Sequence, residues 1–341
     1  MKGSETMSTS MTKGNPLKLM LQFALPLLGF CMGCCTGFGV PVAKYFGAEK
    51  MDTMRNYVFN GAVLTGGIGV TVTILCSVFC PQILHLLSVP EDIFRGAYHY
   101  LLIIFLGIPF TLLYNYLSSI LRSLGDSRTP FLFLAFSAIL NIFLDLFCIV
   151  VLKWGCAGAA AATITAQAIS GILCLVFIGR KMNVLHLTKE NRMVNITAVK
   201  ELLAMGLPTG LQFSITAIGS MVMQSANNGL GSVCVSGFTA GMRIKQFAMC
   251  PFDAIATSAS VFCAIATIYG LLIGLVLIFG GRTLSMIFVK KSAADVLDAS
   301  GKYLRCLGYF FWSLGILNVS RMVTQGLGYS GRAVLSGVTE M

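Results

Sequence analysis

The chain has 341 residues, of which 56% are hydrophobic and 11% are charged, against roughly 25% charged residues in an ordinary soluble domain. This composition excludes a soluble enzyme and indicates a chain whose solvent is mostly lipid. The net charge of +11 does not indicate nucleic-acid binding, because the basic residues lie mostly in loops between apolar runs, where they set membrane topology.

Apolar stretches of about 20 residues, the length that spans a bilayer core, recur along the chain. A polar tail, residues 1–16, comes first and is expected in the cytoplasm, without a cleavable signal peptide. Eight clear stretches follow at Leu17–Ala43, Tyr57–Cys80, Tyr100–Leu121, Phe131–Leu152, Ala157–Ile178, Leu202–Leu230, Ser260–Gly280 and Tyr303–Gln325. The sequence therefore predicts an all-α, polytopic membrane protein.

A ninth stretch, Val233–Ser258, carries Arg243, Lys245 and Asp253. Each such charge costs about 2.5 to 3.5 kcal/mol at the centre of a membrane helix. This stretch is expected to span only if the three charges face protein or water.

A basic loop, residues 181–200, divides the predicted chain into an N-terminal helical lobe, residues 17–180, and a C-terminal lobe, residues 201–341. The lobes echo each other, because LQFALP at Leu21 is matched by LAMGLP at Leu203 and SLGDS at Ser123 by GLGYS at Gly326. Such pseudo-repeats are typical of secondary transporters, whose substrate site lies between two related bundles.

The two lobes differ in length between these echoes. Pro26 and Gly125 are 99 positions apart, whereas Pro208 and Gly328 are 120 positions apart. The difference of 21 residues is about one membrane-spanning helix. We therefore expect the region of the first and second helices to be shortened.

Twelve cysteines lie mostly inside apolar stretches, where they act as small hydrophobic residues. The run Cys31-Met32-Gly33-Cys34-Cys35 can be interpreted as a metal site or as helix packing, and packing is favoured because no histidine or further cysteine pair accompanies it. The sequence also lacks a His/Asp/Glu constellation or an HExxH motif, so we predict no enzyme activity.

Two acidic residues, Asp145 and Asp253, lie well inside apolar stretches, and an intramembrane carboxylate is a functional candidate by default. Asn141 lies one helical turn before Asp145 on the same face. Their oxygens form a hard-oxygen pair that suits Na⁺ or a shared proton. A functional role is favoured over a structural hydrogen bond for Asp145, whereas Asp253 is expected to neutralise Arg243 or Lys245.

These motifs resemble the multidrug and toxic compound extrusion (MATE) family, and its DinF-like branch in particular. The matching segments cover nearly the whole chain: Gly14–Lys18 with Phe23–Pro26, Gly39–Ala43 with Phe46–Ala48, Leu121–Pro130, Gly206–Gln212, Ser214–Ser220 and Pro251–Ala254.

The resemblance implies a plan of two six-helix lobes that face a central cavity, which opens alternately to each side. Compared with that plan, this sequence is incomplete in three places. Leu28 is joined directly to Gly29, without the rest of the first helix and the start of the second; residues are missing after Ser258; and the C-terminal lobe is incomplete. For the DinF-like branch, the resemblance implies cation coupling at Asn141, Asp145 and Thr163.

Another branch of the family carries acidic residues on its seventh and tenth helices. Here the polar groups on those helices include Gln212, Gln224 and Asn318, which are the candidates for the substrate cavity. The resemblance implies no cofactor, and no metal other than Na⁺ at Asp145 if sodium is the coupling ion.

The implied function is efflux of drugs and other small organic cations by Na⁺- or H⁺-coupled antiport. The chain is expected to act as a monomer in the bacterial inner membrane, with a cytoplasmic N-terminus. Two alternatives remain. One is a lipid-linked oligosaccharide flippase, for which only Arg243, Arg305 and Arg321 lie near candidate cavity helices; the other is a truncated membrane protein that does not transport.

Overall fold

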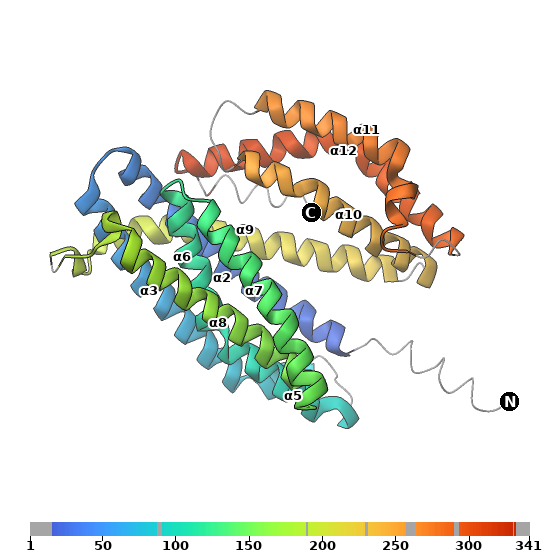
Figure 1. The fold of residues 1–341 in the computed structure, drawn as a ribbon, viewed down its shortest axis with the longest axis horizontal. Helices are drawn as coiled ribbons and strands as arrows, with labels where there is room; N and C mark the ends of the chain where they lie inside the picture. The colour runs from blue at the N-terminus through green and yellow to red at the C-terminus, as the bar shows by residue number, and fades with distance from the viewer. Residues whose placement is uncertain are drawn as a thin grey trace. The chain divides into compact units, whose positions relative to one another are not determined.

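The computed structural model describes residues 16–86, 91–188, 190–228, 231–256, 263–289, 293–329 and 331. Within these ranges the secondary structure is helical and contains no strand (Figure 1). The α-helices are α2 (Pro16–Gly47), α3 (Met51–Val78), α4 (Cys80–Leu86), α5 (Glu91–Leu106), α6 (Ile108–Ser123), α7 (Arg128–Leu146), α8 (Gly155–Lys181), α9 (Ile196–Asn228), α10 (Ser232–Ala256), α11 (Cys263–Ser285) and α12 (Ala294–Gly326).

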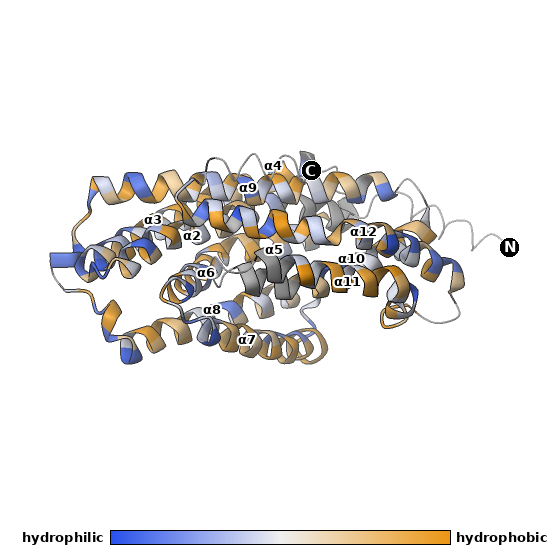
Figure 2. Ribbon diagram, turned by 90° about the horizontal axis from the view of Figure 1, so that it is seen from above, coloured by the Kyte–Doolittle hydropathy of each residue, from blue (hydrophilic) through white to orange (hydrophobic). Residues whose placement is uncertain are grey.

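Eight segments of the described chain are long and apolar enough to cross a membrane, which confirms the eight predicted stretches and the all-α, polytopic fold class. The helices α5 and α6 together form one of these segments, Phe94–Ser123. Figure 2 shows that α7 and α11 consist largely of hydrophobic residues. The ninth predicted stretch is helical as α10, but it is not among the eight segments.

Several helices begin earlier than the apolar runs predict. The helix α9 begins at Ile196 rather than at Leu202, and α12 begins at Ala294 rather than at Tyr303. The added turns are rich in polar residues, which an apolar-run criterion assigns to loops although polar residues such as Lys and Glu favour helix well. The predicted loop 181–200 is therefore shorter than expected.

The contacts divide the chain into two compact units, residues 1–217 and residues 218–341. Unit 1 has a large buried core that includes Phe38, Met54 and Leu121, and unit 2 has its own core around Leu277 and Phe311. The boundary between the units falls within α9, whereas the predicted lobes meet at the loop 181–200, so the lobe boundaries stay a prediction.

The helix α2 continues without a break through Leu28 and Gly29, where the sequence predicts a joint between two shortened helices. It has 32 residues, which is about 48 Å of helix against a hydrocarbon core of about 30 Å. The N-terminal end of α2 and the basic segment that begins at Lys44 therefore lie at opposite ends of one helix.

The two matched segments, SLGDS at Ser123 and GLGYS at Gly326, have the same backbone geometry. Gly125 ends α6 with φ +86°, and Gly328 ends α12 with φ +87°. In both, the next residue donates its N–H to a carbonyl five positions earlier, Asp126 to Leu121 and Tyr329 to Thr324, at 3.0 Å each. This glycine-terminated cap satisfies the last carbonyls of a helix, which gives the sequence echo a physical basis.

Candidate functional site

Asp145 lies in the last turn of α7, just before a π-helical turn at Phe147–Val151. Its Oδ1 atom is buried and accepts no hydrogen bond from the described part of the protein. A buried carboxylate oxygen without a donor is unfavourable, and π-helical turns occur frequently at functional sites. The arrangement leaves an acceptor available for a cation or a proton.

Asn141 and Thr163, the two residues predicted to accompany Asp145, contact each other across the α7–α8 interface. Asn141 Nδ2 donates to Thr163 Oγ1 at 3.4 Å, and Thr163 Oγ1 donates to Ala159 O at 2.9 Å. The helices α7 and α8 are antiparallel, so this register places Asp145 level with Ala159 on α8.

The polar groups continue along α8 by one more turn to Gln167, which the sequence analysis did not select. Thr111 Oγ1 donates to Gln167 Oε1, joining α6 to α8. Asn115, one turn further along α6, donates to Thr111 O at 2.7 Å. The sequence could have indicated Gln167 as a further polar residue of the site, because it follows Thr163 by four residues and both side chains therefore lie on one helix face.

Glu201 is a second carboxylate that the sequence analysis missed, because it comes just before the predicted apolar stretch that begins at Leu202. The helix α9 begins five residues before it, which places Glu201 inside the candidate span Ile196–Gln224. Its Oε1 atom accepts from Lys44 Nζ at 2.9 Å, and its Oε2 atom accepts from Tyr45 Oη at 3.2 Å and from Tyr57 Oη. This contact ties α9 to α2 and α3.

The connection before α9 is held against the start of α3. Arg55 Nε donates to Val184 O at 2.9 Å. The Asn60 side chain donates to Met193 O at 3.2 Å and accepts from the N–H of Asn195 at 3.0 Å. The basic segment around Arg55 and the basic connection before α9 therefore lie at the same end of unit 1.

The three candidates for the substrate cavity fall in different units. Gln212 is buried in unit 1, and Asn318 is buried in unit 2. Asn318 Oδ1 accepts from Arg321 Nη2 at 2.6 Å, and Gln224 is half-buried near the end of α9. A cavity that joins the three residues stays a prediction.

Other selected residues have local roles or lie outside the described side chains. Cys31, Cys34 and Cys35 are buried on α2 and form no disulfide, and they pack in the core of unit 1. Asp253 lies in α10, but its side chain is outside the part that the structure describes.

A family model described as MatE matches residues 17–147. Among curated proteins, the probable multidrug resistance protein YpnP of Bacillus subtilis is 32% identical over 236 residues, which are 69% of this chain and 53% of YpnP. The multidrug export protein MepA of Staphylococcus saprophyticus is 23% identical over 67% of this chain and 51% of its own length. The chain thus spans about half the length of these relatives.

Solved structures share the fold over more of the chain. A MATE structure in complex with MaL6 superposes with a TM-score of 0.88 and 20% identity, covering 95% of this chain and 77% of the other. The outward-facing conformation of a multidrug resistance MATE family transporter of the MOP superfamily superposes with a TM-score of 0.85, also at 20% identity, covering 95% and 76%.

Proposed function

We propose, from the premise that this chain belongs to the MATE family of membrane transporters, that it exports small organic cations in exchange for Na⁺ or H⁺. The observation that carries this proposal is the buried Oδ1 of Asp145, which lacks a donor among the described residues and lies one turn from the Asn141–Thr163 contact. The names of the relatives support drugs as the substrate class.

The proposed mechanism is reciprocal occupancy. Binding of Na⁺ or H⁺ at Asp145 favours one arrangement of the helices, and binding of the organic cation favours the other. Exchange requires each ligand to bind the two arrangements with different affinity, because equal affinity shifts no equilibrium. In this mechanism, Asn141 and Thr163 supply neutral oxygens beside the carboxylate, which suits a hard cation.

The test is efflux of a fluorescent organic cation, ethidium, from bacteria that lack their own drug pumps and express the 341-residue chain. Asp145→Asn keeps the shape of the side chain and removes its charge. Asp295→Asn, at an exposed position in the first turn of α12, is the matched control. Membrane insertion of all three proteins is verified before efflux is compared.

We expect ion-driven efflux from the parent and from Asp295→Asn, and its loss in Asp145→Asn. Unchanged efflux in Asp145→Asn would show that coupling does not run through this carboxylate. An inserted parent that exports nothing would instead support the non-transporting alternative, in which the chain shares ancestry and fold with the family but not activity.

The orientation in the membrane is also a proposal, for a multi-pass protein of the bacterial plasma membrane. Lys44 and Arg55 lie at the end of unit 1 that carries the basic connection before α9, and positive charge is enriched in cytoplasmic loops. This end is therefore proposed to be cytoplasmic. If α2 crosses the membrane once, the N-terminus lies on the opposite side, contrary to the expectation that the polar tail is cytoplasmic. Protease access to an N-terminal epitope tag in spheroplasts decides between the two orientations.

A further inference from the structure

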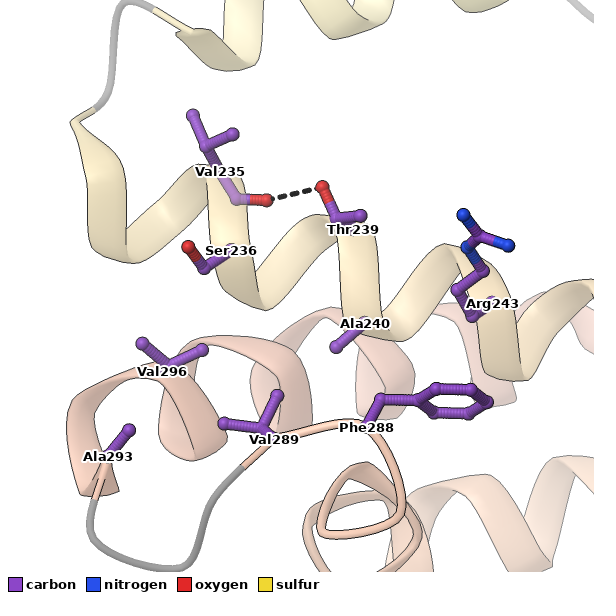
Figure 3. Close-up of a pocket in the computed structure, with 9 residues that line it drawn as sticks. All are labelled: Val235, Ser236, Thr239, Ala240, Arg243, Phe288, Val289, Ala293 and Val296. Carbon is purple, nitrogen blue, oxygen red and sulfur yellow. Dashed lines mark hydrogen bonds between the residues drawn. The ribbon is translucent and has the colours of Figure 1, made fainter. Parts of the chain in front are cut away.

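A pocket of about 710 Å³ lies within unit 2, at one end of α10, α11 and α12. It is formed by the first half of α10, the turn after α11 and the start of α12 (Figure 3). Its volume lies within the range of about 300 to 1,000 Å³ that is typical of small-molecule sites. It is distinct from the Asp145 site, which lies in unit 1.

The walls of the pocket are mostly apolar, whereas its polar groups come from one helix face. Ser236, Thr239 and Arg243 are spaced by three and four residues along α10, so that they share a face. Thr239 Oγ1 donates to Val235 O at 2.7 Å, which leaves its oxygen available mainly as an acceptor. The apolar lining residues are Val235, Ala240, Phe288, Val289, Ala293 and Val296.

Arg243 is the charged residue among those that line the pocket. Among the side chains that the structure describes, which do not include that of Asp253, its guanidinium forms no ion pair, and Asp298 on α12 is paired with Arg282 at 2.9 Å. Figure 3 shows Arg243 and the Phe288 ring toward one end of the pocket, and Val296 and Ala293 toward the other. The pocket therefore has a cationic end and an apolar end.

We propose that this pocket binds an amphiphile with one anionic head group, held by Arg243, and an apolar body that lies against the valines. A guanidinium presents several N–H donors in a planar fork that matches a carboxylate or phosphate in geometry and charge. This pocket is proposed to bind an anion, whereas the function proposed above is export of organic cations. The pocket proposal therefore does not depend on the proposed function.

The test is direct binding to the purified full chain in a neutral maltoside detergent. The probes are anthroyloxy-labelled stearate, its uncharged methyl ester and the corresponding alkylammonium. We expect stearate to bind at least about tenfold more tightly than either of the other probes. They lack the carboxylate and therefore cannot form the charge-assisted hydrogen bond with Arg243. Equal binding of stearate and its methyl ester would overturn the proposal.

Three variants locate the site. Arg243→Gln is expected to weaken stearate binding at least about tenfold, and Arg305→Gln, at an exposed position of α12 outside the pocket, is expected to leave it unchanged. Ser236→Phe fills the pocket from an exposed lining position and is expected to abolish binding of both stearate and the ester. Unchanged stearate binding in Arg243→Gln or in Ser236→Phe would overturn the assignment of the site. If Arg243→Gln does not fold, Ser236→Phe alone tests the assignment.

The anionic head group has two sources, a membrane lipid or a free amphiphile. Competition with phosphatidylglycerol in mixed micelles distinguishes them. Displacement of stearate by the lipid supports a lipid site, and retention of stearate supports a site for free amphiphiles. Because the readout is binding, loss of efflux in the ethidium experiment would leave this result intact.

Discussion

Gly33 on α2 and Gly210 on α9 approach so closely that their backbones are in contact. A Cβ atom added to Gly33 would lie 2.7 Å from the Cα of Gly210 and 2.7 Å from the carbonyl oxygen of Thr209. One turn along, a Cβ on Gly37 would meet Gly206 in the same way, at 2.7 Å from its Cα. The two Gly-x-x-x-Gly pairs face each other in antiparallel register, which is a close-packing arrangement of membrane helices.

Gly37→Ala is expected to destabilise the protein, because the new methyl group meets backbone atoms that cannot move aside. Overpacking of this kind costs about 1 to 3 kcal/mol. Gly66→Ala on α3 is the matched control, since a Cβ there meets nothing within 4 Å and the better helix propensity of alanine favours the variant. Thermal unfolding in detergent measures both variants. A Gly37→Ala protein as stable as Gly66→Ala would contradict the close contact.

Asp126 is expected to make stability depend on pH. Burial raises the pKa of its carboxyl group, but hydrogen bonds from Thr129 and from the backbone N–H of Arg128 outweigh this effect and hold the pKa below its ordinary value of 3.8. A lowered folded-state pKa contributes stability above the unfolded-state pKa, which is lost as the pH falls through the folded-state pKa.

Asp126→Asn is therefore expected to be less stable than the parent near neutral pH, with a difference that shrinks below a pH of about 3.8. Asparagine keeps an acceptor oxygen for the start of α7 and removes only the charge. The check is the melting temperature of both proteins across this pH range. A difference that is constant with pH would show that the charge does not contribute.

Glu201 is expected to matter more for stability than its partner Lys44. The Lys44 side chain is 62% exposed and that of Glu201 is 23% exposed, so their ion pair alone contributes about 0 to 1 kcal/mol. Glu201 also accepts from Tyr45 and Tyr57, and charged acceptors make stronger hydrogen bonds.

We expect Glu201→Gln to destabilise the protein by about 1 to 2 kcal/mol, and Lys44→Met to destabilise it less. Glu190→Gln, at an exposed position, controls for loss of a carboxylate. Thermal unfolding of the three variants gives the order. If Lys44→Met is as damaging as Glu201→Gln, the ion pair rather than the tyrosine contacts holds α9 in place.

In the proposed antiport, Thr163→Val is expected to reduce ethidium efflux by about threefold, the effect of one interhelical hydrogen bond of about 0.6 kcal/mol. Valine keeps the shape of the side chain and removes the oxygen that accepts from Asn141. Thr324→Val, whose hydroxyl donates to Ser320 O in its own helix, is the control. An efflux rate equal to that of the parent would show that the Asn141–Thr163 contact does not support coupling.

The fold class and the eight apolar spans could be predicted from the sequence alone and are confirmed, whereas the candidate pair Asn141 and Asp145 stays a prediction. The spans were predictable because lipid requires long uninterrupted apolar runs, and the pair could be proposed because residues four apart lie on one helix face whatever surrounds them. The glycine-terminated caps at Gly125 and Gly328 were also visible as a sequence echo, because few residues other than glycine adopt a positive φ readily.

The contacts between helices, in contrast, became known only from the three-dimensional structure. The contact of Asn141 with Thr163, the bond between Thr111 and Gln167, and the Glu201 cluster join residues 22 to 157 positions apart. No local periodicity encodes such pairs, because they depend on the register of packed helices. The polar first turn of α9 was likewise predicted to be a loop. The structure shows that it is helical and that Glu201 within it contacts α2 and α3.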